Sequence, residues 1–396
     1  MNKTPAVRFK GSTEEWEHRK LGELVHLNGR IGFRGYTQND IISKDEGGIL
    51  TFSPTNIINN QLILDIKNTY ITQEKYDESP EIKIRNDDIL FVKTGSTLGK
   101  SALVTGLTEP ASINPQIVVM RTKTELRRYL SAQLTSVFIQ KQVTVEKIGG
   151  AVPTLTETKI KNFDVFIPVD SKESTSIGDC FSNIDSLITF HQRKYEKLKN
   201  IKKSMLYKMF PRNGSKVPEI RFAGFTGDWE QRKLGDEAIE MVAGGDIDKS
   251  LLDDYGKYPV IANALTDDGI VGYYASDYRI KAPAVTVTGR GDVGHAKART
   301  VDFTPVVRLL SVRSKHDVFF LENAINTLNV IVESTGVPQL TVPQLSQYEI
   351  FFPPTITEEK EIGAFFERVD NLITLHQRKL EKLKQLKQAM LHKMFV

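Results

Sequence analysis

Two long segments carry hydrophobic residues at alternating intervals of four and three positions. In the first segment these positions are Ile177, Phe181, Ile184, Ile188, His191, Tyr195 and Leu198. In the second they are Ile362, Phe366, Val369, Ile373, His376, Leu380 and Leu383. This spacing is the a/d pattern of a coiled-coil seam, and it lasts for three heptads in each segment. The pattern therefore predicts two long helices that pack against each other.

The predicted helices begin at capping-box patterns, Asp170 with Glu173 and Thr355 with Glu358. A helix of about 38 residues is about 57 Å long, at 1.5 Å per residue. Since a single apolar stripe of that length cannot stay exposed, the economical partner of each helix is the other one. We expect antiparallel packing, which relates the two halves by a pseudo-twofold axis and places the segments before each helix at opposite ends.

The chain contains two copies of the same pattern. Residues 5–22 (PAVRFKGSTEEWEHRKLG) match residues 218–235 (PEIRFAGFTGDWEQRKLG) at an offset of 213. Residues 152–168 match 337–353, and residues 177–210 match 362–395, both at an offset of 185. The second copy has therefore lost 28 residues from its middle. Because the middles, about 30–150 and 240–335, are otherwise dissimilar, the chain is one scaffold duplicated around two diverged inserts.

The inserts show shorter runs, with more strand than helix. Strands are predicted at 49–57, 88–95, 116–122 and 284–291, and helices at 126–143 and 318–334. We interpret each insert as a small α+β domain. The predicted fold is thus α+β, with two recognition domains, 1–168 and 213–354, alternating with two long helices, 169–212 and 355–396.

Composition adds several exclusions. The chain has 396 residues and a net charge of +4, which is too small to indicate a nucleic-acid partner without knowing where the charges lie. The single cysteine, Cys180, excludes an internal disulfide and a multi-cysteine metal site. The N-terminus lacks a signal-peptide pattern, and no run of 18 apolar residues occurs, so we expect a cytoplasmic protein.

Two glycine-rich turns follow predicted strands. Residues 95–101 (GSTLGKS) resemble a phosphate-binding loop but have three residues between the glycines, where that motif has four. Residues 288–295 (TGRGDVGH) place His295 where the lysine would stand. One interpretation is an ordinary tight turn. The other is a turn that presents polar side chains to phosphates or base edges, and its candidates are Lys93, Thr94, Ser96, Lys100, Arg290, His295 and Lys297.

Aromatic and amide residues add further DNA-contact candidates. Arg30, Arg34 and Tyr36 lie in the run RIGFRGY, where arginine can form two hydrogen bonds to guanine and tyrosine can stack. Asn263 can pair with adenine, and Tyr273 and Tyr274 lie nearby in the sequence. The alternatives are a plain loop for the first group and core packing for the tyrosine pair.

The late parts of both helices are basic, which suits either a solvated face or a docking surface. The docking candidates are His191, Arg193, Lys194, His376, Arg378 and Lys379. A metal bound between the two histidines is an alternative to a polar seam residue that fixes register, but no other ligand accompanies them. The sequence shows no methyltransferase motif, cofactor loop or nucleophile elbow, and Glu81-Ile82-Lys83 is an isolated nuclease-like triplet. We therefore predict no catalytic residue and no metal or cofactor in this chain.

Taken together, the repeats resemble the specificity subunits of type I restriction–modification enzymes. The resemblance is carried by the doubled RF-x-G-x-T-x-x-W-E-x-R-K-L-G segment, the doubled VP-x-L-T segment and the doubled HQRK-x-EKLK helix that ends in KMF. These motifs cover about half of the chain. The family has no invariant base-reading residue, so only the two glycine turns and the late helix faces are matched to roles.

The resemblance implies a non-catalytic, sequence-specific DNA-binding subunit. Each insert would read one half of a bipartite double-stranded DNA site, and the helices would set the spacer. Two modification subunits, which use S-adenosylmethionine, would dock on the helices. Restriction subunits, which use ATP and Mg²⁺, would join them. The alternatives are a stand-alone DNA methyltransferase or nuclease, and a scaffold protein that does not read DNA.

Overall fold

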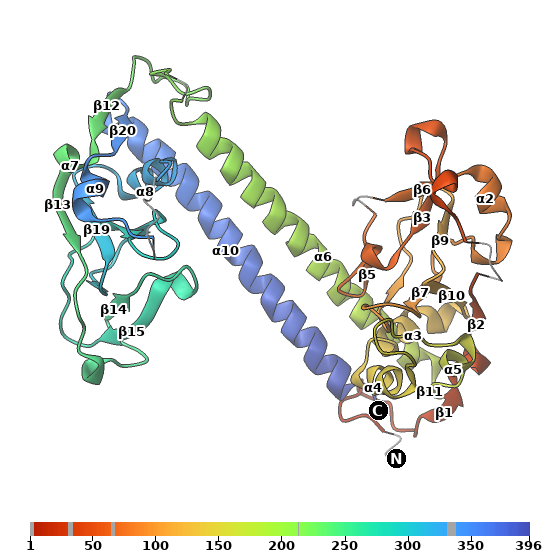
Figure 1. The fold of residues 1–396 in the computed structure, drawn as a ribbon. Helices are drawn as coiled ribbons and strands as arrows, with labels where there is room; N and C mark the ends of the chain where they lie inside the picture. The colour runs from red at the N-terminus through yellow and green to blue at the C-terminus, as the bar shows by residue number, and fades with distance from the viewer. Residues whose placement is uncertain (1–3, 31–34, 65–67, 213, 331–337) are drawn as a thin grey trace. The chain divides into compact units, whose positions relative to one another are not determined.

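A computed structural model describes residues 4–30, 35–64, 68–212, 214–330 and 338–396 (Figure 1). The chain forms two compact units. Unit one comprises Met1–His191 and Lys379–Val396, and unit two comprises Gln192–Arg378. Each unit therefore contains one insert together with one end of each long helix.

Unit one is built from short, mostly antiparallel strands with helices between them. Its main sheet has the order β2 (His26–Asn28), β10 (Ile117–Arg121), β7 (Ile89–Val92) and β8 (Ser101–Leu103). A second sheet consists of β6 (Thr69–Ile71), β3 (Ile49–Phe52) and β9 (Ala111–Ile113), with β9 parallel to β3. Two further pairs are β1 (Glu17–Lys20) with β11 (Asp164–Ile167), and the hairpin of β4 (Ile57–Ile58) and β5 (Gln61–Leu62). The short helices are α1 (Leu21–Leu24), α2 (Gln73–Asp77), α3 (Arg127–Gln133), α4 (Val137–Glu146) and α5 (Glu157–Lys161).

Unit two repeats this topology although its insert differs in sequence. Its main sheet has the order β13 (Ala238–Ala243), β19 (Leu309–Ser314), β16 (Ala284–Thr288) and β17 (Ala296–Arg299). Its second sheet consists of β15 (Ile270–Tyr274), β14 (Tyr258–Ile261) and β18 (Thr304–Pro305), again with one parallel pair. The pair of β12 (Glu230–Lys233) and β20 (Glu349–Phe352) corresponds to β1 and β11, and the short helices are α7 (Leu234–Glu237), α8 (Val318–Asn326) and α9 (Val342–Ser346). The predicted α+β repeat is therefore confirmed.

Two predicted helices are shorter than expected. The single helix predicted at 126–143 is wrong, because α3 ends at Gln133 and α4 starts after Ser136. The Ser136 hydroxyl caps α4 by accepting from the Ile139 amide at 3.4 Å, which favours a new helix start over continuation. The helix predicted at 318–334 ends at Asn326, and its last residues, 331–334, lie outside the described residues.

The long helices α6 (Ser171–Lys208) and α10 (Ile356–Lys393) each have 38 residues. Within unit one, Ile184 and Ile188 of α6 form a buried cluster with Leu380 of α10. Lys387 also pairs with Asp185 at 2.6 Å. The early part of α6 thus contacts the late part of α10, which confirms the antiparallel packing. Nowhere in the described chain is a helix long and apolar enough to cross a membrane.

The reverse contact occurs within unit two. There Lys202, late in α6, pairs with Asp370, early in α10, at 2.7 Å. The KMF motif that ends each helix is buried against the repeated tryptophan of the same unit. Phe395 lies 6.5 Å from Trp16 in unit one, and Phe210 lies 6.0 Å from Trp229 in unit two, measured between ring centroids. The doubled motifs therefore build one kind of core twice.

The predicted capping boxes are only half correct. Asp170 and Thr355 do cap the helices, by accepting from the Lys172 and Glu358 amides. The carboxylates of Glu173 and Glu358, however, turn into the core and bind the guanidinium groups of Arg8 and Arg221. The repeated RF segment is thus fastened to the first turn of each long helix.

Candidate nucleic-acid interface

The two glycine turns occupy equivalent places in the two main sheets. One connects β7 to β8, and the other connects β16 to β17. The Val92 amide donates to the carbonyl of Lys100 at 2.8 Å, and the Thr288 amide donates to the carbonyl of His295 at 3.0 Å. Lys100 and His295 therefore occupy equivalent positions at the ends of the two turns, as the comparison of the two sequence copies suggested.

The doubled VP-x-L segment holds both turns. In unit one, the Gly95 amide donates to the Pro153 carbonyl at 2.9 Å, and the Leu155 amide donates to the Lys93 carbonyl at 2.8 Å. In unit two, the Gly291 amide donates to the Pro338 carbonyl at 3.3 Å, and the Leu340 amide donates to the Gly289 carbonyl at 2.9 Å. Leu155 and Leu340 are buried, so each segment is anchored in its core. The sequence showed both motifs but gave no sign that they touch.

Close packing explains one glycine of the second turn. A Cβ at Gly289 would lie 2.2 Å from the carbonyl oxygen of Arg308 and 3.0 Å from that of Leu340. The backbone at both residues is held in place, because the Arg308 amide donates to the Gly244 carbonyl and the Leu340 amide donates to the Gly289 carbonyl. Moving either segment away would break these hydrogen bonds. Position 289 is therefore restricted to glycine by the neighbouring chain.

The turns expose polar side chains of different kinds. Ser96 and Lys100 are exposed in unit one, and Arg290, His295 and Lys297 are exposed in unit two, whereas Thr94 is half-buried. His295 pairs with Asp292 at 3.0 Å. Within the described chain, no hydrogen bond or ion pair engages the side chains of Lys100 and Arg290. These two cations can therefore reach a ligand without first breaking a contact.

Arg30 and Tyr36 face each other. The guanidinium carbon of Arg30 lies 5.5 Å from the centroid of the Tyr36 ring, and its Nη2 donates to the Ile113 carbonyl at 3.4 Å. Burial lowers the pKa of Arg30 and raises the pKa of Tyr36. A DNA contact by either side chain would require the pair to separate, and it stays a prediction. Arg34 lies outside the described residues.

Two amides that the sequence reasoning missed connect this pair to the glycine turn. The side chain of Asn114 lies beside Tyr36 and opposes the rise in the pKa of Tyr36, and its Nδ2 donates to Gln116 Oε1 at 3.1 Å. The Gln116 carbonyl accepts from the Lys93 amide at 2.8 Å. Lys93 itself pairs with Glu157 at 2.9 Å. The two motifs of the first insert thus lie in one neighbourhood, and the polar residues just before β10 were the available signal.

Asn263 has a positioning role in unit two. Its Oδ1 accepts from the Gly289 amide at 2.8 Å, and its Nδ2 donates to the Val307 carbonyl at 3.0 Å. Both ends of the amide are thus engaged by the backbone that shapes the second turn. Tyr273 and Tyr274 are half-buried neighbours on β15, where successive side chains point to opposite faces. The Tyr274 hydroxyl donates to the Asp248 carbonyl at 3.1 Å.

The docking candidates differ in exposure. Arg193, Lys194, Arg378 and Lys379 are exposed, His191 is buried and His376 is half-buried. In the described part of the chain, no cluster of three or more histidine, cysteine or acidic side chains could hold a metal ion.

The helices also expose an apolar pair that the sequence reasoning missed. Leu187 and Phe190 of α6 are 47% and 50% exposed. Leu372 and Leu375, which occupy the same positions of the repeat in α10, are 44% and 45% exposed. The sequence does contain a signal for these pairs, because both copies place apolar residues there, outside the a/d positions of the heptads.

Comparison with known proteins agrees with this architecture. The family model described as "Type I restriction modification DNA specificity domain" matches residues 13–200 and 226–385, which is most of the chain in two repeats. A type I specificity subunit of Mycoplasma pneumoniae is 29% identical over 138 residues, covering 33% of this chain and 37% of that relative. A type I restriction enzyme specificity subunit of Methanocaldococcus jannaschii is 22% identical over 401 residues, covering 96% of this chain and 92% of the relative.

A solved structure shows the same fold. The crystal structure of the type I restriction–modification S subunit from M. genitalium superposes with a TM-score of 0.73 at 12% identity, covering 99% of each chain. The family match confirms the resemblance found in the repeats, and it places the chain among specificity subunits rather than catalytic ones. The chain belongs to the family of type I restriction–modification DNA specificity subunits.

Proposed function

We propose that each insert reads one half of a bipartite DNA site, with residues 1–168 and 213–354 as the two recognition domains. One observation carries this proposal. Two inserts with dissimilar sequences build the same sheet and present the same turn, but with different exposed side chains, Ser96 and Lys100 against Arg290 and His295. Two domains that recognise different half-sites need the same fold but different polar side chains at the contact surface.

The chemistry of the turns suits DNA. Lysine and arginine contact phosphates or the guanine edge, and arginine can form two hydrogen bonds to guanine. Arg290 is the best candidate for reading a base, because it is exposed next to a turn whose backbone is fixed by Pro338 and Asn263. Lys93 is a weaker candidate, since Glu157 already neutralises it.

The long helices would set the spacer and dock the partner subunits. The exposed apolar pairs, Leu187 with Phe190 and Leu372 with Leu375, occur once in each repeat. This repetition suits one copy of a modification subunit on each helix. Exposed Arg193, Lys194, Arg378 and Lys379 would add charge to the same surfaces. S-adenosylmethionine would belong to the modification subunits, ATP and Mg²⁺ to the restriction subunits, and the complex would act in the cytoplasm.

The experiment is a binding assay with Arg290→Ala in the complex with its modification subunits. Duplexes carrying single base changes across the recognised site would be compared at one fixed salt concentration, because phosphate contacts depend on salt. If Arg290 reads a base, the variant loses about 1–3 kcal/mol of discrimination at one position only.

Arg290→Lys is the matched control, because it keeps the charge but loses the paired donors. It should lose the same discrimination if arginine reads a base, and it should bind normally if the residue contacts phosphate. The absence of any salt-dependent duplex binding by the complex would favour a scaffold that does not read DNA, and would refute the proposal.

A further inference from the structure

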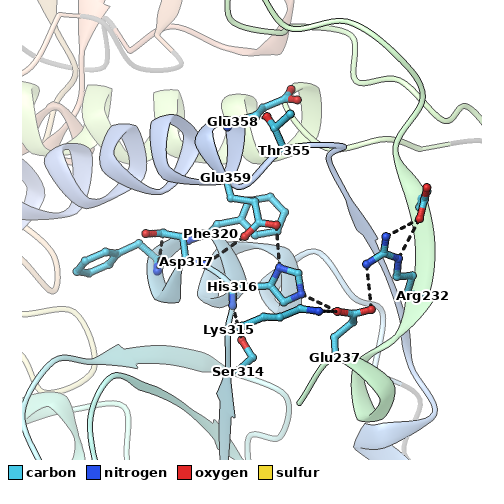
Figure 2. A network of polar contacts seen from close by, with 12 residues as sticks. Arg232, Glu237, Ser314, Lys315, His316, Asp317, Phe320, Thr355, Glu358 and Glu359 are labelled. Atoms are coloured by element: carbon cyan, nitrogen blue, oxygen red, sulfur yellow. Dashed lines mark hydrogen bonds and ion pairs between the residues drawn. The ribbon is translucent and has the colours of Figure 1, made fainter. Parts of the chain in front are cut away.

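A histidine lies buried between two carboxylates in unit two (Figure 2). The His316 Nδ1 lies 2.7 Å from Glu359 Oε1, and its Nε2 lies 2.8 Å from Glu237 Oε2. The side chains of His316, Glu237 and Glu359 are 7%, 10% and 3% exposed. The ring also packs on Phe352, with 4.2 Å between the two centroids. This cluster has no part in the proposed DNA contacts.

The geometry fixes the protonation of the ring. A neutral imidazole has one N–H group, so one of the two short contacts would set a nitrogen lone pair against a carboxylate oxygen. Both contacts are hydrogen bonds only when both nitrogens carry a proton. Burial lowers the pKa of His316, but its hydrogen bonds to Glu359 and Glu237 outweigh burial and raise the pKa overall.

Donors and cations surround both carboxylates. Glu237 accepts from Arg232 of β12 at 3.0 Å and lies 3.6 Å from Lys315. Although burial raises the pKa of Glu237, its hydrogen bonds from His316 and Arg232 lower it overall. Glu359 accepts from the backbone amide of Asp317 at 3.1 Å and lies in the first turn of α10, where the helix dipole favours a negative charge. The proton between these groups therefore belongs to His316.

The cluster connects three parts of unit two. His316 lies between the end of β19 and Asp317, which caps α8 by accepting from the Phe319 and Phe320 amides. Glu237 is the last residue of α7, and Glu359 lies at the start of α10. One imidazolium thus ties the main sheet of the second insert to the long helix. The other charged groups of the cluster are Arg232 of β12 and Lys315 after β19, which pair with Glu237, and Asp317 before α8, on which Lys360 of α10 acts.

Among the described residues of unit one, no equivalent cluster occurs. The repeat offsets place Leu24 at the position of Glu237 and Ser174 at the position of Glu359. The Ser174 hydroxyl donates within its own helix, to the Ser171 carbonyl at 2.9 Å. The chain therefore carries its own internal comparison, since the second insert has this charged cluster and the described residues of the first insert do not.

We propose that His316 is a positioning residue that holds the second insert on helix α10, so that loss of its proton weakens reading of the second half-site but not of the first. This inference rests on the proposed function. Folding raises the pKa of the imidazole, so the tie is complete below the ordinary histidine pKa and is lost as the pH rises through the raised value. Protonation of Glu237 limits the cluster at acid pH. Because the pKa of Glu237 is lowered, its contribution to stability is lost only as the pH falls below the ordinary carboxylate range.

The first test needs no DNA. The full chain, labelled with ¹⁵N at histidine, is titrated by NMR from about pH 6 to about pH 9, the range in which a histidine with a raised pKa changes charge. The signal of His316 is assigned by its absence in His316→Gln. Two protonated ring nitrogens are expected, and the proton should be lost at a pH above the ordinary histidine range. A neutral ring at about pH 7 would overturn the inference.

The second test measures duplex binding by the complex over the same pH range, with each half-site scrambled in turn. Binding that depends on the second half-site should weaken several-fold as the pH rises, and His316→Gln should remove this dependence. Glu237→Gln keeps the size of the side chain and should weaken the second half-site even if His316→Gln folds poorly. His18→Gln is the control, because His18 forms a more exposed pair with Asp164 in unit one.

Equal pH dependence of both half-sites, or an unchanged dependence in His316→Gln, would overturn the inference. The proposed function fails in a different way. If the complex binds no duplex at any pH while the NMR spectrum shows an imidazolium, DNA reading is refuted although the charged tie exists.

Discussion

The ion pair between Arg8 and Glu173 leads to the sharpest stability prediction. Glu173 is nearly fully buried, with 1% of its side chain exposed, and its partner Arg8 is 10% exposed. Two guanidinium nitrogens donate to the carboxylate at 2.8 and 2.6 Å, and Trp16 Nε1 donates to it at 3.2 Å. Arg8→Ala removes the positive charge and both hydrogen bonds from the guanidinium to Glu173. It leaves a buried carboxylate with the indole N–H.

The cost follows from what remains in the core. Removing one partner of a buried ion pair typically destabilises a protein by about 3–5 kcal/mol. Since Glu173 keeps the indole donor, we expect about 3 kcal/mol for Arg8→Ala. In unit two, Glu358 binds Arg221 in the same way, but within the described chain Trp229 Nε1 has no partner. Arg221→Ala should therefore cost about 1 kcal/mol more, which is the usual value of one hydrogen bond.

The two tryptophans allow each unit to be followed separately. Trp16 and Trp229 are both 1% exposed, and they are the only tryptophans in the chain. Urea unfolding is followed by fluorescence in a Trp229→Phe background for unit one and in a Trp16→Phe background for unit two. Arg8→Ala should lower the free energy of unfolding reported by Trp16.

Lys10→Ala is the control, because Lys10 is an exposed cation near Arg8 and its removal should change stability by less than about 0.5 kcal/mol. A loss below about 1 kcal/mol for Arg8→Ala would show that Glu173 does not depend on this ion pair. Equal effects of Arg8→Ala on the transitions of both units would also contradict the prediction.

Three further predictions follow from the packing. Phe395→Ala should cost about 3–5 kcal/mol in the transition reported by Trp16, because the ring fills the core of unit one, and an unchanged midpoint would contradict this role. Gly289→Ala should destabilise unit two by about 2 kcal/mol or more, because the new Cβ would meet the Arg308 carbonyl, whereas Gly291→Ala meets no atom and should show only the strain of its positive φ. Lys387→Met should make unit one less stable as the pH rises from about 4 to about 7, because burial already raises the pKa of Asp185 and the variant removes the cation that opposes this shift. A raised carboxyl pKa contributes stability below its ordinary value and loses it as the pH rises through the raised value, and equal urea midpoints at both pH values would contradict the prediction.

The long helices and the repeat were predictable from sequence because their signals are periodic and occur twice. A heptad needs only the spacing of residues such as Ile184 and Ile188, and its antiparallel partner follows from chain order. The break in the helix predicted at 126–143 was missed because a side-chain cap at Ser136 competes with continuation over only a few residues. The periodicity of hydrophobic residues contains no information about such a cap.

The site was predictable only in part. The glycine turns were found because glycine and polar residues follow a strand, a signal contained within a few positions. The burial of Arg30 against Tyr36 was missed because it depends on Ile113 and Asn114, which are distant in the sequence. The cluster around His316 could not be seen for the same reason, and the other copy offers no counterpart to reveal it.

We propose above all that each insert reads one half-site independently of the other insert. The most direct measurement replaces residues 1–168 with the corresponding insert of a diverged family member and maps DNA methylation across the genome of the host. We expect one half of the methylated site to change, while the other half and the spacer stay the same. A change in both halves, or in neither, would show that the inserts do not read the two half-sites independently.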